Sequence, residues 1–234
     1  MPILPESFRV FLRSKAPAAL LAVLAFFFLA TPPAQAGNLE EALAAAQRGN
    51  ADALSKFLKS GAVSPNAEDK DGNSLLILAA RDGHVEAVEA VLRFRPKVDY
   101  RNRTGDSALM LAASQGDMKL LDLLLANGAK TNPPGDKNAW TALHYAALEG
   151  KLPIVERLLA VGADINALTP NLSNALMLAA RNGHIDIVRR LLQTPIDLNR
   201  RNDRGLTADE WALSKGNTKI ADLIVEARTA RARR

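Results

Sequence analysis

A unit of 33 or 34 residues recurs six times along this chain, and this period restricts the possible folds more than any other feature. Each unit has a pair of small apolar residues, a glycine three positions later and an apolar doublet eight positions after the glycine. The glycines are Gly49, Gly83, Gly116, Gly150, Gly183 and Gly216. Units this short cannot bury an apolar face alone, so they are expected to stack into one continuous core with contacts between neighbours.

Two helices are predicted in each unit, one on either side of the glycine. The first, of about ten residues, carries the small pair (Ala146-Ala147 in the fourth unit), whose side chains let neighbouring helices approach closely. The glycine ends this helix because it adopts a positive φ at little cost. In the second helix, for example 184–192, apolar residues recur on one face at helical spacing. A Gly-Ala pair such as Gly128-Ala129 ends it, and an extended turn leads to the next unit.

Residues 136–147, DKNAWTALHYAA, resemble the ankyrin repeat, whose 33-residue unit carries a Thr-Pro-Leu-His-x-Ala core. Looser copies lie at 74–80 and 174–180, and the Gly-Ala-Asp-Ile-Asn run at 162–166 also matches. The resemblance implies an all-α ankyrin-repeat solenoid over residues 37–227, followed by a basic tail at 228–234. Its units are expected near 38–68, 69–101, 102–135, 136–168, 169–201 and 202–227.

Some positions depart from the family pattern. The signature proline is replaced throughout, and the turn glycine present as Gly72, Gly105 and Gly205 is replaced by Ala139 and Leu172. A residue other than glycine at positive φ costs about 1 kcal/mol or more. We therefore expect those two turns to take another shape. In the last unit Asp209 and Glu210 replace mostly apolar residues, which is interpreted as a polar outer face on a terminal cap.

The first 36 residues have the order of a secretory signal peptide. Arg9, Arg13 and Lys15 precede the apolar run 18–30, and the small-x-small site Ala34-Gln35-Ala36 follows it. The run is short for a bilayer span, which needs about 20 residues. We expect cleavage after Ala36 and delivery to the periplasm of a bacterium by the general secretion route, with only transient membrane contact. The alternative is an uncleaved signal that anchors the chain in the inner membrane.

Composition and motifs exclude most catalytic chemistry. Cysteine is absent, and no nucleotide-binding loop or hydrolase motif occurs. The histidines are His84, His144 and His184; the ankyrin resemblance implies that each occupies a family position where the imidazole bonds neighbouring loop backbone, rather than a metal site. The acidic run 68–72 lacks the first and last ligands of a calcium loop and is interpreted as a hairpin turn. We expect no catalytic residue, no metal and no cofactor.

The resemblance implies a monomeric scaffold whose concave surface binds another protein. The residues mapped to that surface are Lys70, Asp71, Asn73, Arg81, Asp82, Arg103, Thr104, Asp106, Ser114, Gln115, Lys137, Asn138, Trp140, Leu148, Glu149, Asn171, Ser173, Arg181 and Asn182. Lys70, Arg103 and Lys137 form a short basic row that suits an acidic partner. Most residues in the slot of Trp140 are polar, so its side chain is predicted to be exposed as a binding anchor. The alternative is that this side chain folds back onto the fifth unit.

Charge and the chain ends complete the functional expectations. After removal of residues 1–36 the excess of cations is small, so nucleic acid is not expected as a partner. The arginines of the tail are interpreted as a loose, solvated helix end, or alternatively as a contact to acidic molecules. We expect a non-catalytic scaffold acting outside the cytoplasm. The alternatives are an inhibitor or immunity-type protein that caps an exported enzyme or toxin, and a membrane-tethered structural protein.

Overall fold

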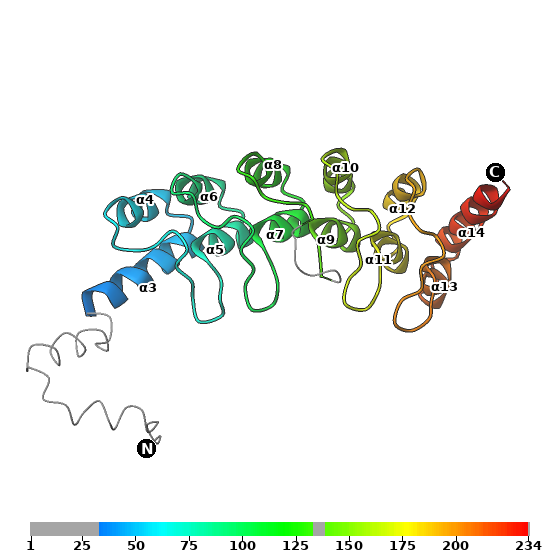
Figure 1. Ribbon diagram of the computed structural model, residues 1–234, viewed down its shortest axis with the longest axis horizontal. Helices are drawn as coiled ribbons and strands as arrows, with labels where there is room; N and C mark the ends of the chain where they lie inside the picture. Colours follow the sequence, from blue (N-terminus) through cyan, green and yellow to red (C-terminus); the bar gives the residue numbers. More distant parts are fainter. Residues whose placement is uncertain (1–32, 133–138, 234) are drawn as a thin grey trace, which may run out of the picture.

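The computed structural model describes residues 33–132 and 139–233, which form a curved, elongated stack of helical hairpins (Figure 1). The described part contains twelve helices, two in each predicted unit. They are α3 (Pro33–Gln47), α4 (Ala51–Lys59), α5 (Leu75–Arg81), α6 (Val85–Leu92), α7 (Ala108–Gln115), α8 (Met118–Ala126), α9 (Ala142–Leu148), α10 (Leu152–Ala160), α11 (Ala175–Asn182), α12 (Ile185–Leu192), α13 (Ala208–Ser214) and α14 (Thr218–Ala232). The all-α solenoid predicted from the period is confirmed.

The helices form two rows. The odd-numbered helices α3 to α13 form an inner row in which each packs against the next, and the even-numbered helices form an outer row. The hairpin loops project from the inner row on the side away from the outer helices (Figure 1). This arrangement leaves the loops and the ends of the inner helices accessible on one face of the array, which we call the hairpin face.

The pairs of small residues are buried between inner helices, as their period predicted. Both alanines of the pairs at 79–80, 112–113, 146–147 and 179–180 are fully buried. In the last pair Ala212 is buried, but 53% of Leu213 is exposed. No further unit packs against α13 within the described residues, so its outermost slot can hold a larger side chain.

The hairpin turns are held by side chains that bind the backbone ahead of them. Asp69 Oδ1 accepts N–H bonds from Asp71 (2.9 Å) and Asn73 (2.8 Å), so the acidic run is a hairpin turn, as predicted. The prediction for Leu172 is wrong, because Leu172 keeps the glycine conformation with φ of 61°. Its N–H bonds the Thr169 carbonyl at 2.8 Å, as Gly72 bonds Asp69 at 3.0 Å, so the turn bonds compensate for the strain. The other expected departure, at Ala139, adjoins residues outside the described part.

All three histidines bond loop or helix-end backbone, which confirms their structural interpretation: His84 and His184 bond the preceding unit, and His144 bonds the end of its own unit. The Nε2 atom of each ring lies 2.8–3.0 Å from a carbonyl oxygen, that of Gln47 for His84, Ala167 for His144 and Leu148 for His184. The bonds of His84 and His184 thus link the second unit to the first and the fifth unit to the fourth.

The last helix closes the array in a way that the sequence did not predict. α14 continues through the arginine-rich residues to Ala232. Arg231 donates to the carbonyls of Ile196 (2.7 Å), Leu192 (2.8 Å) and Thr194 (2.7 Å). Arg228 pairs with Asp209, which is buried rather than on a polar outer face. The expectation of a loose, solvated tail is therefore wrong for these two arginines, because their guanidinium groups bind a buried carboxylate of the sixth unit and backbone carbonyls of the fifth.

Residues 1–32 of the predicted signal segment 1–36 lie outside the described residues, and the expected cleavage position after Ala36 falls within α3. Within 33–132 and 139–233, none of the helices combines the length and apolar character that crossing a bilayer requires.

Candidate protein-binding surface

The hairpin face gathers most of the residues that the sequence assigned to a binding surface. Those that are exposed are Lys70, Asp71, Arg81, Asp82, Arg103, Thr104, Gln115, Glu149, Arg181 and Asn182. Those that are half-buried are Asp106, Ser114, Trp140, Leu148 and Asn171. Lys137 and Asn138 lie outside the described residues, so the expected basic row is described only at its first two members.

Two residues assigned to the surface are buried, so the structure corrects these assignments. Asn73 is 3% exposed and connects two hairpins: its Nδ2 donates to Asp69 Oδ2 (2.9 Å), and its Oδ1 accepts from Asn102 Nδ2 (2.8 Å). Ser173 occupies the same slot in the fifth unit and is fully buried. The slot lies at the base of the hairpin, where a side chain meets the neighbouring unit instead of solvent.

Trp140 is also not the exposed anchor that its mostly polar slot indicated. Its ring lies 5.2 Å from the Tyr145 ring and 5.9 Å from the His144 ring, measured between centroids, and it packs against the core. Its carbonyl accepts a bond from Arg101 Nη2 at 3.3 Å. The aromatic body thus covers α9, which supports the alternative of packing onto the array, although onto its own unit rather than the fifth.

The Trp140 neighbour Tyr145 faces the preceding unit. Its hydroxyl donates to Asp106 Oδ1 at 2.5 Å, and Thr104 Oγ1 donates to the other carboxylate oxygen at 2.7 Å. Burial of the ring, together with the bond to Asp106, raises the pKa of Tyr145. Asp106 is therefore held by groups within the array, and it has little capacity left for a partner.

Exposed charge is unevenly distributed on the hairpin face, and sequence reasoning missed one part of it. The Arg181 guanidinium lies 5.1 Å from the centroid of the Trp211 ring. Trp211 is 4% exposed and belongs to the core. Nearby in the sequence, Lys215 and Arg204 of the last unit are exposed, yet neither was assigned to the surface. Counting cations by unit along the chain could have revealed them.

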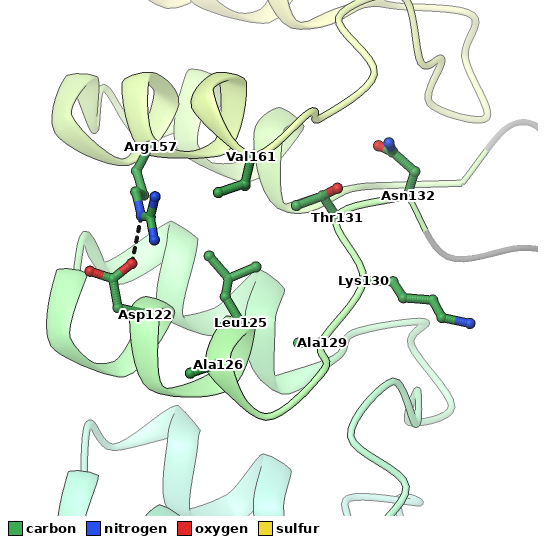
Figure 2. Close-up of a pocket in the computed structure, with 9 residues that line it drawn as sticks. All are labelled: Asp122, Leu125, Ala126, Ala129, Lys130, Thr131, Asn132, Arg157 and Val161. Atoms are coloured by element: carbon green, nitrogen blue, oxygen red, sulfur yellow. Dashed lines mark hydrogen bonds and ion pairs between the residues drawn. The ribbon is translucent and has the colours of Figure 1, made fainter.

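An open groove of about 540 Å³ lies on the opposite side of the array, between the outer helices α8 and α10 (Figure 2). Arg157 Nε pairs with Asp122 Oδ1 at 2.6 Å across this gap, while Leu125 and Val161 line it (Figure 2). The two charges satisfy each other, and the groove brings together no acid, base and nucleophile.

The described residues offer no centre for metal or acid–base chemistry. Within them, no three histidine, aspartate or glutamate side chains are grouped to hold a metal ion. His144 is buried, and desolvation lowers its pKa to about 4. Its Nδ1 accepts the Thr141 N–H at 3.1 Å, so Nε2 carries the proton that bonds Ala167. Both ring nitrogens thus form hydrogen bonds with backbone groups.

Comparison with known proteins agrees with this geometry. A family model described as "Ankyrin repeats (3 copies)" matches residues 42–134, 95–169 and 143–233. The chain belongs to the ankyrin-repeat family. Its repeats form a protein–protein interaction module, and the family is generally non-catalytic.

The curated relatives share stretches of repeats with this chain. A probable E3 ubiquitin-protein ligase XBOS32 of Oryza sativa subsp. japonica is 29% identical over 154 residues, covering 66% of this chain and 30% of the relative. The nuclear factor NF-kappa-B p105 subunit of Mus musculus is 38% identical over 81 residues, or 33% of this chain and 8% of the relative. A transient receptor potential cation channel subfamily A member 1 homolog of Caenorhabditis elegans is 29% identical, over 49% of this chain and 12% of its own length. This chain thus spans less than a third of each of these relatives.

Proposed function

We propose that this protein is a non-catalytic scaffold of an exported bacterial type, which acts in the periplasm and binds another protein on its hairpin face. The observation that carries the binding proposal is the row of exposed polar and charged side chains on the hairpin tips and inner helix ends. A surface of this kind suits a mixed polar interface, in which charge controls encounter and specificity. The export proposal rests on the basic, apolar and Ala34-Gln35-Ala36 segments at the N-terminus.

Export is tested by sequencing the N-terminus of the protein recovered from a periplasmic extract of the producing cell. A first residue Gly37 is the expected result. Recovery of the intact N-terminus in the membrane fraction would instead favour the tethered alternative.

Binding on the hairpin face is tested by placing a photo-crosslinking residue at one position on each side of the array. Arg103 is an exposed hairpin residue, and Glu156 is an exposed residue of the outer helix α10. We expect a discrete crosslinked partner from position 103 and none from position 156. Equal crosslinking from both positions, or none from 103, would contradict the proposed surface.

A further inference from the structure

The positive charge of the chain beyond residue 36 is concentrated in its last two units and the arginine-rich tail that follows them. Residues 170–234 contain twelve lysines and arginines against seven aspartates and glutamates, whereas residues 37–169 contain fifteen against seventeen. The excess of cations beyond residue 36 therefore belongs to the C-terminal third. A localised excess of this kind creates a potential that attracts oppositely charged partners.

Four of the twelve cations are arginines of the tail 228–234, and residues 170–227 hold eight cations against seven carboxylates. These charges are unevenly placed between the two sides of the array. On the outer helices α12 and α14, the cations Arg189, Arg190 and Lys219 are matched by three carboxylates, those of Asp186, Asp222 and Glu226. Two further arginines of α14 are used inside the protein, because Arg228 pairs with Asp209 and Arg231 binds three backbone carbonyls.

On the hairpin face, three exposed cations remain without an intramolecular carboxylate partner. Arg201 pairs with Glu210 at 2.9 Å. Among the described residues, Arg181, Arg204 and Lys215 form no salt bridge, and all three are exposed. The hairpin carries one exposed carboxylate beside them, Asp203.

Comparison of two equivalent arginines shows why Arg181 is available. Arg81 occupies the same slot three units earlier, where its guanidinium binds Asn73 Oδ1 at 2.5 Å. Burial opposes ionisation of Asp69, but bonds from Asn73 and the nearby Arg81 charge hold the pKa of Asp69 below its usual value. In the fifth unit, Thr169 and Ser173 replace this Asp-Asn pair. The hairpin partner that engages Arg81 is therefore absent beside Arg181.

The Arg181 guanidinium packs on the Trp211 ring, whereas the Arg81 guanidinium bonds a residue of its own hairpin. A guanidinium stacked on an indole face is restrained, and its planar donors remain free to bind a carboxylate with two parallel bonds. A restrained side chain loses less conformational entropy when a ligand binds. Lys215 follows Trp211 by four residues at the end of α13, so a second cation stands beside this platform.

We propose that Arg181, Arg204 and Lys215 form an acidic-peptide site on the hairpin face of the last two units, with Arg181 on Trp211 as its anchor. The proposal rests on the proposed function and specifies the partner chemistry: a protein segment rich in aspartate or glutamate. The basic row Lys70 and Arg103 is a weaker candidate, because Asp71 is exposed beside it and Asp69 lies at the base of the same hairpin.

The test measures binding of the full chain to a fluorescent ten-residue glutamate peptide at low salt, with a glycine-serine peptide as the neutral control. Three variants are compared with the parent: Arg181→Ala, the triple variant Arg181→Glu/Arg204→Glu/Lys215→Glu, and the matched triple variant Arg189→Glu/Arg190→Glu/Lys219→Glu on the outer helices. Both triple variants change the net charge equally. We expect roughly tenfold or greater weakening in the hairpin-face triple variant, a smaller loss in Arg181→Ala and little change in the outer-helix triple variant.

Equal weakening in both triple variants would show attraction by net charge alone and would overturn the site. Absence of peptide binding to the parent chain would overturn it as well. So would binding to phosphatidylglycerol vesicles that is stronger than binding to the peptide and that persists in the hairpin-face triple variant. The crosslinking experiment at position 103 is independent of these outcomes. If it identifies a partner while the glutamate peptide fails to bind, the acidic site is wrong and the scaffold function stands; if it identifies none, the scaffold proposal itself fails.

Discussion

Asp209 and Arg228 connect the last two helices of the array through a bidentate ion pair, in which only 9% of the Asp209 side chain is exposed. Burial raises the pKa of Asp209, but bonds from Arg228 and from Thr207 Oγ1 outweigh it, so its pKa lies below the usual value. Arg231 extends this connection by binding three carbonyls at the end of α12 and the loop after it. Together these contacts cover an end of the core that would otherwise meet water.

Removal of one partner of this pair is expected to weaken the C-terminal cap. Arg228→Ala leaves Asp209 buried and unpaired, which costs about 3 kcal/mol of unfolding free energy. The double variant Asp209→Ala/Arg228→Ala should lose less than the sum of the single variants, because no unpaired charge remains. Denaturant unfolding of all four proteins measures the coupling; additive losses would show that the pair contributes no interaction.

Enlargement of an inner-helix alanine is expected to disturb the stack between two units. Ala147 is fully buried, and Ala147→Leu should cost about 1–3 kcal/mol by overpacking. Leu213 occupies the equivalent slot in the last unit but is 53% exposed, so Leu213→Ala should change stability by only about 0.5 kcal/mol. Comparison of the denaturant midpoints tests the assigned register, and an unaltered midpoint in Ala147→Leu would contradict it.

The stability of the array should fall as the pH falls through the range set by His144. Desolvation lowers the folded pKa of His144 to about 4 from an ordinary value of 6.5, so below pH 6.5 the unfolded chain binds the proton more readily. The loss begins near pH 6.5, grows to about pH 4 and amounts to roughly 3 kcal/mol. Unfolding curves of the parent and of His144→Gln between pH 7 and pH 4 measure this contribution. A parent and variant with identical pH dependence would show that His144 is not responsible.

Trp140 is expected to contribute to stability more than to binding. Because its ring packs on Tyr145 and His144 while half-buried, Trp140→Ala should cost about 1–2 kcal/mol. Trp140→Phe should retain part of that packing. Thermal unfolding and the crosslinking yield at position 103 distinguish the two roles. Intact stability with a lost partner would restore Trp140 as a surface anchor.

Relief of backbone strain offers a stabilising change. Arg95 has φ of 52° and an exposed side chain, at the position where the first unit has Gly61 with φ of 70°. Arg95→Gly removes a left-handed strain of about 1–2 kcal/mol but adds about 0.5–1 kcal/mol of unfolded-state entropy. The midpoint of denaturation should therefore rise slightly. Arg93→Gly, at an exposed cap residue with φ of −57°, is the control and should lower it.

The sequence by itself determined the parts of this protein that depend on local spacing. The 33-residue period predicted the two-helix units, the glycines between helices and the buried alanine pairs, and the family resemblance implied the histidines bound to neighbouring backbone. Each of these follows from the size, φ preference or hydrogen-bonding groups of a residue at a regular position.

Only the tertiary structure decided which members of equivalent slots are available to a partner, because that depends on the adjacent unit. Arg81 is engaged by a hairpin that carries Asp69 and Asn73, whereas Arg181 stands on Trp211. Asn73 and Trp140 occupy one slot, yet one is buried in a hairpin and the other covers an aromatic neighbour. The packing of α14 was likewise decided by the tertiary structure, because Arg228 and Arg231 hold this helix through a carboxylate and backbone carbonyls that lie 19 to 39 residues away in sequence.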